Sequence, residues 1–386
     1  MRIAITVSML CLLAACDAAP RGEAASGWTL TRDAVAGAGE GPGALTEVGD
    51  VTLSEQGDVY VTQPQESVVR SYDRTGRFLR AIGREGEGPG EFDRIGGLGW
   101  RGDSLWVQDS GNRRISFFGP DLRYVRSVSF TGMGAMTRGR PNIPGYVLAD
   151  GSVLGYWQAP LQELVGRTVT DRMVRFTDAG EPLSVLDSVE LRHLFSEVRT
   201  ATGVTYGPQP FADSPIQQVA HDGSAIVIVT RTAAPSGDSA AFGVRRIDPA
   251  GHVRLNRRYP YRPVPLPERM ADSTLDAISG RWGVSRRPGA PDAALRRELR
   301  KTVYLPRNLP PVTMMVLGRD GTIWLRRERT GEPAFRWTVL DSAGEILSEL
   351  RIPARTMVKY ADRTQLWAVE HDSLDVPTLV RYRVTP

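Results

Sequence analysis

Two glycine-proline stretches are the first residues whose types and spacing suggest chemistry: GEGPGAL (Gly39–Leu45) and GEGPGEF (Gly86–Phe92). A glycine-rich loop that cradles a phosphate is expected to open a helix and often carries a Lys-Ser or Lys-Thr pair. Neither stretch contains a lysine, and the residues after both predict β-strands. We therefore interpret the two stretches as joints between repeated units and not as nucleotide-binding loops.

Signatures of catalysis are scarce elsewhere in the chain. The sequence contains neither the Gly-x-Ser-x-Gly elbow of serine hydrolases nor the His-Glu-x-x-His motif of zinc proteases. The four histidines (His193, His221, His252 and His371) lack the spacing of metal ligands, and His221-Asp222 suggests a turn. We therefore favour a non-catalytic protein over an enzyme.

A repeat of four short strands supplies the elements that would position a site. After each joint the sequence shows an apolar strand, a turn at Gly57-Asp58 or Gly102-Asp103, and an aromatic-aliphatic second strand. A polar loop, a third strand and a fourth strand follow. Self-similarity at a period of about forty to fifty residues, with four strands in each unit, is typical of β-propeller blades.

Four further units follow with weaker similarity. Their turns are marked by Asp150-Gly151, Asp222-Gly223, Asp320-Gly321 and Asp362-Arg363, and Asp-Gly pairs favour tight hairpins. The sixth unit stops after its third strand, while Trp28–Thr31 predicts a strand that belongs to no unit. We expect this strand to complete the last blade, because a closed ring leaves no unpaired edge. The predicted fold is all-β, a six-bladed β-propeller of four-stranded antiparallel blades over residues 28–386.

The second unit carries a family resemblance. Residues Ile82–Phe118 (IGREGEGPGEFDRIGGLGWRGDSLWVQDSGNRRISFF) are similar to the NHL repeat in their GPGEF lead-in and in the pattern WVQDSGNRRISFF. The match is good over Val48–Ile82 and consists only of pattern elsewhere. The chain as a whole resembles exported six-bladed β-propeller proteins related to NHL repeats, which implies the fold more firmly than an activity. Propeller lactonases and related hydrolases use Glu, Asn and Asp around a channel metal such as calcium, and no residue here can be matched to that set.

The loops between blades and the loops between second and third strands should share one face, which propellers commonly use for ligands. From this face we predict the candidate ligand-binding residues Gln63, Asp109, Asn112, Arg113, Trp157, Gln158, Arg231, Arg326, Glu370 and His371. Asp109 and Asn112 also suit a structural role, because the NHL resemblance implies that short polar side chains there cap backbone N–H groups. The Trp157 side chain also suits packing between blades.

A long insertion between the fourth and fifth units, at about residues 261–311, interrupts the repeat. It predicts one helix at Pro267–Ile278, stopped at Gly280, and a second at Pro291–Val303. Its basic residues form either a solvated helix face or a lid that attracts an anion: Arg286, Arg287, Arg296, Arg297, Arg300 and Lys301. Two other long segments, 155–172 and 191–213, belong to the same face.

The N-terminal residues predict export. Arg2 precedes an apolar run, Ile3–Leu13, that is too short to span a bilayer, and Leu13-Ala14-Ala15-Cys16 resembles a bacterial lipobox. We expect residues 1–16 to hold a lipoprotein signal with Cys16 as the lipidated residue, and residues 17–27 to form a flexible tether. An ordinary signal peptide with an incidental Cys16 is the alternative. The only other cysteine is Cys11, so the mature domain is predicted to contain no disulfide.

Composition and charge exclude few functions. The 386 residues are 41% hydrophobic and 24% charged with a net charge of +4, which is typical of a globular chain. No basic run interleaved with aromatics indicates a nucleic-acid partner. The favoured function is a monomeric, lipid-anchored module of the bacterial cell envelope that binds a protein or a small acidic ligand without a cofactor. The alternatives are a metal-assisted, lactonase-like hydrolase or lyase at the channel mouth, in which the channel would hold calcium, and a purely structural scaffold.

Overall fold

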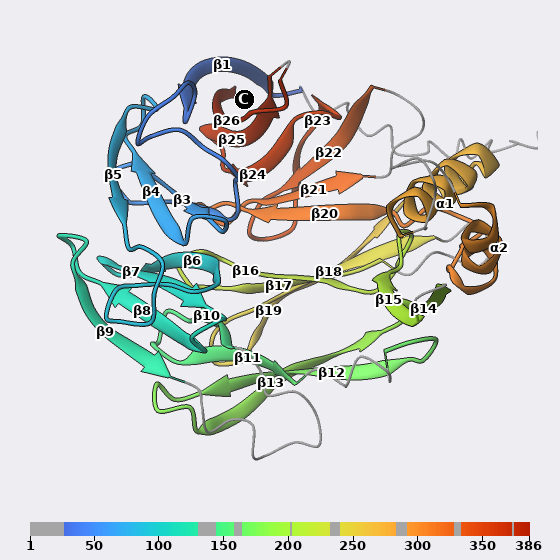
Figure 1. The fold of residues 1–386 in the computed structure, drawn as a ribbon, viewed down its shortest axis with the longest axis horizontal. Coiled ribbons are helices and arrows are strands. Elements are labelled where there is room, and N and C mark those ends of the chain that lie inside the picture. Colours follow the sequence, from blue (N-terminus) through green and yellow to red (C-terminus); the bar gives the residue numbers. More distant parts are fainter. Residues whose placement is uncertain are drawn as a thin grey trace, which may run out of the picture.

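The computed structural model describes residues 27–129, 144–157, 164–200, 203–231, 240–282, 292–327, 333–372 and 374–386. Six antiparallel sheets of four strands each follow one another around the molecule (Figure 1). This arrangement confirms the predicted six-bladed β-propeller. Within the described ranges, no helix is long and apolar enough to cross a membrane.

Each blade is a meander of consecutive strands, except the last, whose outer strand comes from the N-terminal end. Blades 1 to 3 consist of β2 (Val51–Leu53), β3 (Val59–Gln63), β4 (Val68–Tyr72) and β5 (Phe78–Ile82); β6 (Ile95–Arg101), β7 (Ser104–Asp109), β8 (Arg114–Phe118) and β9 (Tyr124–Ser129); and β10 (Pro144–Val147), β11 (Val153–Trp157), β12 (Val169–Phe176) and β13 (Pro182–Leu191). Blades 4 to 6 consist of β16 (Ile216–Val219), β17 (Ile226–Thr230), β18 (Ala241–Ile247) and β19 (Val253–Pro260); β20 (Val312–Leu317), β21 (Ile323–Arg327), β22 (Ala334–Leu340) and β23 (Ile346–Pro353); and β24 (Met357–Ala361), β25 (Gln365–His371), β26 (Pro377–Thr385) and β1 (Thr29–Ala36).

The N-terminal strand completes blade 6. β1 pairs antiparallel with β26 over its full length, from Thr29 opposite Thr385 to Ala36 opposite Leu379. Figure 1 shows the blue β1 lying against the red β26. The observed strand is longer than the expected Trp28–Thr31, and it leaves β26 with a partner on both sides.

The core lies between neighbouring blades. Every residue of β3 is buried, and Tyr60 and Val69 of blade 1 form one cluster with Leu98 and Leu105 of blade 2. Four indole rings on the second or third strands of their blades are almost completely buried: Trp106, Trp324, Trp337 and Trp367. Large aromatic side chains therefore fill the wedge between blades, where burial of their surface is most stabilising.

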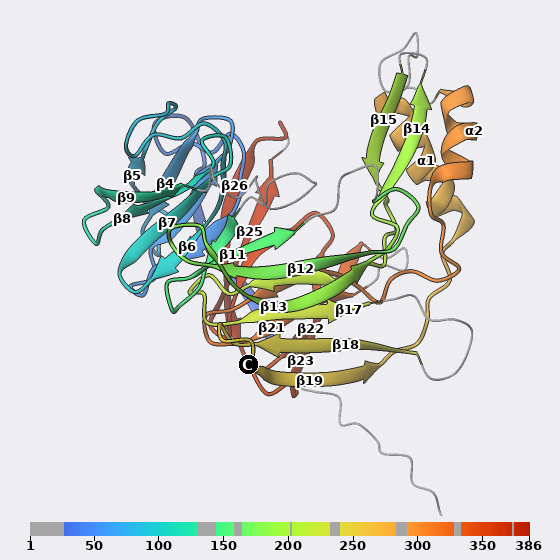
Figure 2. The same cartoon turned by 90° about the horizontal axis from the view of Figure 1, so that it is seen from below.

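Two insertions outside the blades pack against each other. The segment between blades 3 and 4 forms a hairpin of β14 (Phe195–Thr200) and β15 (Gly203–Pro208), and the segment between blades 4 and 5 forms α1 (Glu268–Trp282) and α2 (Ala293–Thr302). Their shared apolar cluster consists of Val198, Leu275, Leu295, Leu299 and Val303. Figure 2 shows the four elements standing together as a projection from the propeller. We call β14, β15, α1 and α2 the cap.

The helical insertion between blades 4 and 5 is confirmed, with different helix ends. The prediction that Gly280 ends the first helix is wrong, since a single glycine costs only about 1 kcal/mol in a helix and Leu275 and Ser279 on α1 are completely buried. The second helix begins after Asp292, whose Oδ1 accepts hydrogen bonds from the backbone N–H groups of Ala294 (2.9 Å) and Leu295 (3.0 Å).

The sequence pattern also missed regular structure in the other two long segments. Part of the expected loop 155–172 is paired strand, because Gly155 and Trp157 of β11 lie opposite Val174 and Arg172 of β12. The segment 191–213 contains the β14–β15 hairpin, which was not predicted.

Candidate functional site

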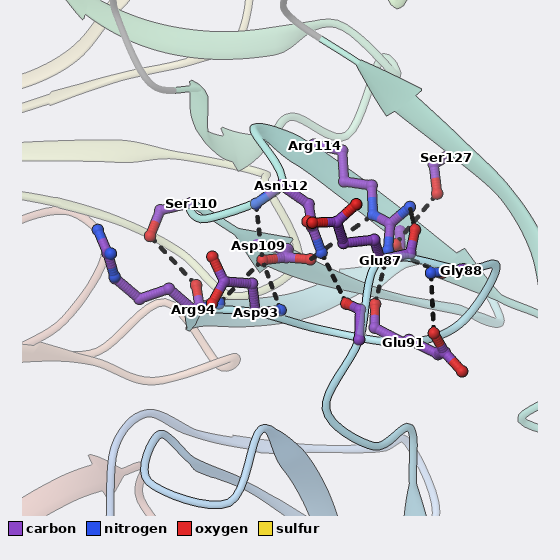
Figure 3. A network of polar contacts seen from close by, with 12 residues as sticks. Glu87, Gly88, Glu91, Asp93, Arg94, Asp109, Ser110, Asn112, Arg114 and Ser127 are labelled. Atoms are coloured by element: carbon purple, nitrogen blue, oxygen red, sulfur yellow. Dashed lines mark hydrogen bonds and ion pairs between the residues drawn. The ribbon is translucent and has the colours of Figure 1, made fainter.

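The second glycine-proline stretch lies between β5 and β6, as expected for a joint. The buried carboxylate of Asp109, at the end of β7, accepts hydrogen bonds from the backbone N–H groups of Asp93 (3.2 Å) and Arg94 (3.1 Å). The Asn112 side-chain amide donates to the Gly86 carbonyl (2.9 Å) and to Asp109 Oδ2 (2.7 Å) (Figure 3). These contacts fix the joint onto blade 2. Asp109 caps backbone N–H groups as expected for a structural role, whereas the Asn112 side chain binds a backbone carbonyl and Asp109 instead.

Arg114 completes the same network. Its guanidinium donates to the backbone carbonyls of Glu87 (2.9 Å), Gly88 (2.8 Å) and Glu91 (2.7 Å). Its Nε atom lies 3.6 Å from Asp109 Oδ2. The carbonyl oxygens of this joint therefore point at a cation of the protein itself, which is the opposite of the N–H cradle that a phosphate needs.

Blade 1 holds its joint with different side chains. Gln63 is completely buried, and its Oε1 atom accepts hydrogen bonds from the Thr46 backbone N–H (3.1 Å) and from Arg70 Nη1 (3.2 Å). Arg70 also donates to the Pro42 carbonyl (2.9 Å) in the first glycine-proline stretch. Gln63 thus has the same place in blade 1 that Asp109 has in blade 2.

The other predicted site residues are distributed over blades 2, 3 and 6. In blade 6, Glu370 accepts a hydrogen bond from the Tyr382 hydroxyl, and His371 is exposed at the end of β25. Arg113 is exposed, with a backbone φ of 51° in the left-handed region. Trp157 ends β11, and its side chain and Gln158 lie outside the described residues.

Two predicted residues, Arg231 and Arg326, are brought together by neighbouring blades. Arg231 follows β17 in blade 4 and donates to the carbonyls of Ser214 (2.6 Å) and Val312 (3.2 Å). Arg326 on β21 in blade 5 donates from Nε to the Thr313 hydroxyl (2.9 Å). Val312 and Thr313 are consecutive residues of β20, and consecutive Cα atoms lie about 3.8 Å apart. The two guanidinium groups are therefore hydrogen-bonded to neighbouring positions of one strand.

Both arginines line a pocket of about 330 Å³ between the cap and the propeller. Other lining residues come from the segment after the hairpin, from α1 and from blade 5: Phe211, Met270, Leu309 and Phe335. The Arg326 guanidinium lies 4.5 Å from the centroid of the Phe335 ring, which fixes it over an aromatic face. Ligand pockets of mostly apolar lining with a few convergent polar groups commonly measure about 300–1,000 Å³. We call this hollow the arginine pocket.

Burial makes the two charges in the arginine pocket poorly solvated. Burial lowers the pKa of Arg231 to about 10, although the nearby carboxylate of Asp213 acts in the opposite direction. Burial also lowers the pKa of Arg326. Both side chains remain cationic at neutral pH. Asp213 is the carboxylate that acts on Arg231, and burial is the cause of the lowered pKa of Arg326. Such a pair of half-buried cations favours an anionic ligand.

Three basic residues of α2, by contrast, form ion pairs inside the cap. Arg296 forms ion pairs with Asp272 (2.8 Å) and Asp276 of α1, and Arg300 lies 2.6 Å from Asp272. Lys301 pairs with Glu298 of its own helix (2.8 Å). The charges of Arg296 and Arg300 therefore hold α2 to α1, and all three side chains already have an acidic partner.

A polar cluster that the sequence pattern did not indicate lies across the propeller axis. The turn after β16 crosses from blade 4 to blade 2, where the His221 carbonyl accepts a hydrogen bond from the Trp100 N–H (2.7 Å). The buried His221 ring lies 3.6 Å from the Asp50 carboxylate of blade 1. Lys359 of blade 6 donates to the Gly49 carbonyl (2.7 Å), and burial lowers the pKa of this lysine while Asp50 raises it. His221-Asp222 does form a turn, so the pattern gave no sign that the imidazole reaches another blade.

A metal would find few protein ligands in this cluster. Among the described residues, no group of three or more His, Cys, Asp and Glu side chains is placed to hold a metal ion. Asp50 already faces the imidazole of His221 and the ammonium group of Lys359. The cluster therefore does not fit calcium, which takes 6–8 oxygen ligands, and we derive no metal chemistry from it.

The six blades and the cap together make this chain a capped six-bladed β-propeller. No family model and no curated protein matches the sequence. A crystal structure of a DUF4221-family member from Bacteroides vulgatus aligns with a TM-score of 0.52 and 12% identity, covering 94% of this chain and 99% of that chain. A Bacteroides fragilis protein whose name presents it as exported aligns with a TM-score of 0.48 and 10% identity over 94% of this chain and 97% of that one. Virginiamycin B lyase from Staphylococcus aureus aligns with a TM-score of 0.41 and 12% identity over 88% and 96%. Only the first of these alignments, with a TM-score above 0.5, supports the fold, and at 12% identity it supports the fold alone.

Proposed function

We propose that this chain is an exported, lipid-anchored propeller that binds an acidic ligand in the arginine pocket without chemical conversion. The observation that carries the proposal is the pair Arg231 and Arg326, which are half-buried in one pocket and hydrogen-bonded to consecutive residues of β20. An anion that enters the pocket interacts with these charges in a medium less polar than water, where the attraction is stronger than at an exposed site.

The location of the protein is part of the same proposal. The predicted lipoprotein signal and Cys16 support attachment to the bacterial envelope through a lipid, with residues 17–27 as a tether and the propeller as a monomer. Neither nucleic acid nor a cofactor has a role in it. The hydrolase or lyase alternative and the scaffold alternative stay predictions, and the pair of Asp50 and His221 is where a search for catalysis would begin.

Replacing Cys16 with serine is expected to move the protein from the membrane fraction to the soluble fraction of its bacterial host. Serine has no thiol for lipid attachment, and a lipid chain is the only membrane contact in the proposal. Fractionation followed by immunoblotting checks this, with Cys11→Ser as the matched control. Unchanged membrane association of the Cys16 variant would contradict the anchor.

Arg231→Gln and Arg326→Gln are each expected to weaken the binding of benzoate, a small aromatic acid, by at least about tenfold. A hydrogen bond to a charged group contributes about 1.5–3 kcal/mol, and about 1.4 kcal/mol corresponds to a factor of ten. Isothermal titration calorimetry at low salt measures the affinity. Arg297→Gln, which removes an exposed arginine from α2, is the control and should bind like the unaltered protein.

The melting temperatures of the variants separate lost binding from lost structure. Equal benzoate affinity in the unaltered protein and both pocket variants would count against the proposed function. The same conclusion would follow if the unaltered, folded protein bound neither benzoate nor any other small carboxylic acid.

A further inference from the structure

A second hollow of about 400 Å³ adjoins the arginine pocket. It lies between the end of the hairpin and α1, and its walls are Pro208, Gln209, Pro210, Ser273, Thr274, Ala277 and Ile278. Gln209 and Pro210 line the arginine pocket as well, so the two hollows share these residues as a common wall or rim. We call the second hollow the cap groove.

The polar side chains of the cap groove are already engaged within the protein. The Ser273 and Thr274 hydroxyls donate to the Met270 carbonyl, at 3.1 Å and 2.8 Å. The Gln209 amide donates to the Thr302 carbonyl (3.2 Å) and accepts from the Tyr304 N–H (2.8 Å). What these side chains present to a ligand is therefore mainly carbon, added to that of the two prolines, the alanine and the isoleucine.

None of the residues that line the cap groove carries a charge, whereas the adjoining pocket holds two half-buried guanidinium groups. A ligand that fills both hollows must then be anionic at one end and apolar along the rest. Guanidinium groups offer planar pairs of N–H donors that match the two oxygens of a carboxylate.

We propose that the ligand is an amphipathic monocarboxylic acid with a linear apolar body. Its carboxylate lies between Arg231 and Arg326, and its hydrocarbon chain passes Gln209 and Pro210 into the cap groove and lies along α1. This inference rests on the proposed function and specifies its ligand. The inference also assigns a function to both insertions. The groove has one wall from each of them, and it forms because the hairpin and α1 pack together.

Affinity is expected to rise along the series butanoate, hexanoate and octanoate, each measured by calorimetry below its micelle concentration. Burial of one methylene is worth about a factor of four, so even partial burial should make octanoate bind at least about thirtyfold more tightly than butanoate. Octanol, which lacks the carboxylate, should bind at least about tenfold more weakly than octanoate.

Ala277→Asp places a charge in the cap groove without touching the arginines. This variant should bind butanoate normally and lose the dependence on chain length. Ala294→Asp, an exposed alanine of α2, is the matched control and should retain that dependence.

Three outcomes overturn the inference, and the first two leave the proposed function intact. The first is arginine-dependent binding of benzoate together with equal affinities for butanoate and octanoate. The second is an unchanged chain-length dependence in Ala277→Asp. Octanol binding as tight as octanoate binding would also overturn it, because the carboxylate would then have no part. Failure of the folded protein to bind any acid, benzoate included, would instead refute the proposed function itself.

Discussion

Deleting residues 27–36 is expected to lower the free energy of unfolding by on the order of 5 kcal/mol and to make the protein aggregate. The deletion removes β1, whose residue Ala36 is completely buried, and the Trp28 ring, which packs edge-on against Trp324 at 5.8 Å. It also leaves Arg381 without Asp33, its partner at 2.8 Å. The whole outer edge of β26 would then be open to pairing with another chain.

Urea denaturation and light scattering check this expectation. A protein that lacks only residues 17–26 is the matched control, and it should unfold like the longer chain because β1 is retained. If the deletion of residues 27–36 left both the unfolding midpoint and the monomeric state unchanged, closure of the ring by β1 would be unimportant for stability.

Asp109→Ala is expected to cost about 3–5 kcal/mol, the largest effect that we expect from a single substitution. The carboxylate is completely buried and accepts hydrogen bonds from the backbone of Asp93 and Arg94 and from the Asn112 side chain. Removing it leaves these donors unsatisfied and takes the nearby negative charge from Arg114.

Urea unfolding of Asp109→Ala and of Asp178→Ala makes the comparison direct. The Asp178 carboxylate is 62% exposed and lies 3.7 Å from Arg126, so its loss should cost no more than about 0.5 kcal/mol. Similar unfolding midpoints for the two variants would show that the network around the second joint contributes little.

The blades could be predicted from the sequence because each one repeats the same local signals. Asp-Gly turns and aromatic second strands are local features, and glycines such as Gly57 and Gly321, with φ of 86° and 80°, occupy turn positions that other residues rarely adopt. The capping role of Asp109 was predictable for the same reason, since its partners lie within one blade and its joint, whereas the Asn112 side chain binds the Gly86 carbonyl and not an N–H group.

The cap could not be predicted because its stability depends on contacts between distant segments. Val198 of the hairpin packs against Leu275 and Leu299 of the helices, and neither segment shows this in its own pattern. Only the two arginines of the arginine pocket could be predicted from the sequence, and the pocket itself could not. Arg231 and Arg326 could be assigned to one face, but their shared attachment to β20 and their burial depend on how blades 4 and 5 and the cap pack.

The most direct test of the central claim is a crystal structure of the protein grown with benzoate. Our account predicts the benzoate carboxylate within hydrogen-bond distance of the Arg231 and Arg326 guanidinium groups, with its ring between Phe211 and Phe335 beneath α1. Benzoate bound at another face, or bound in this pocket without contact to either arginine, would contradict it.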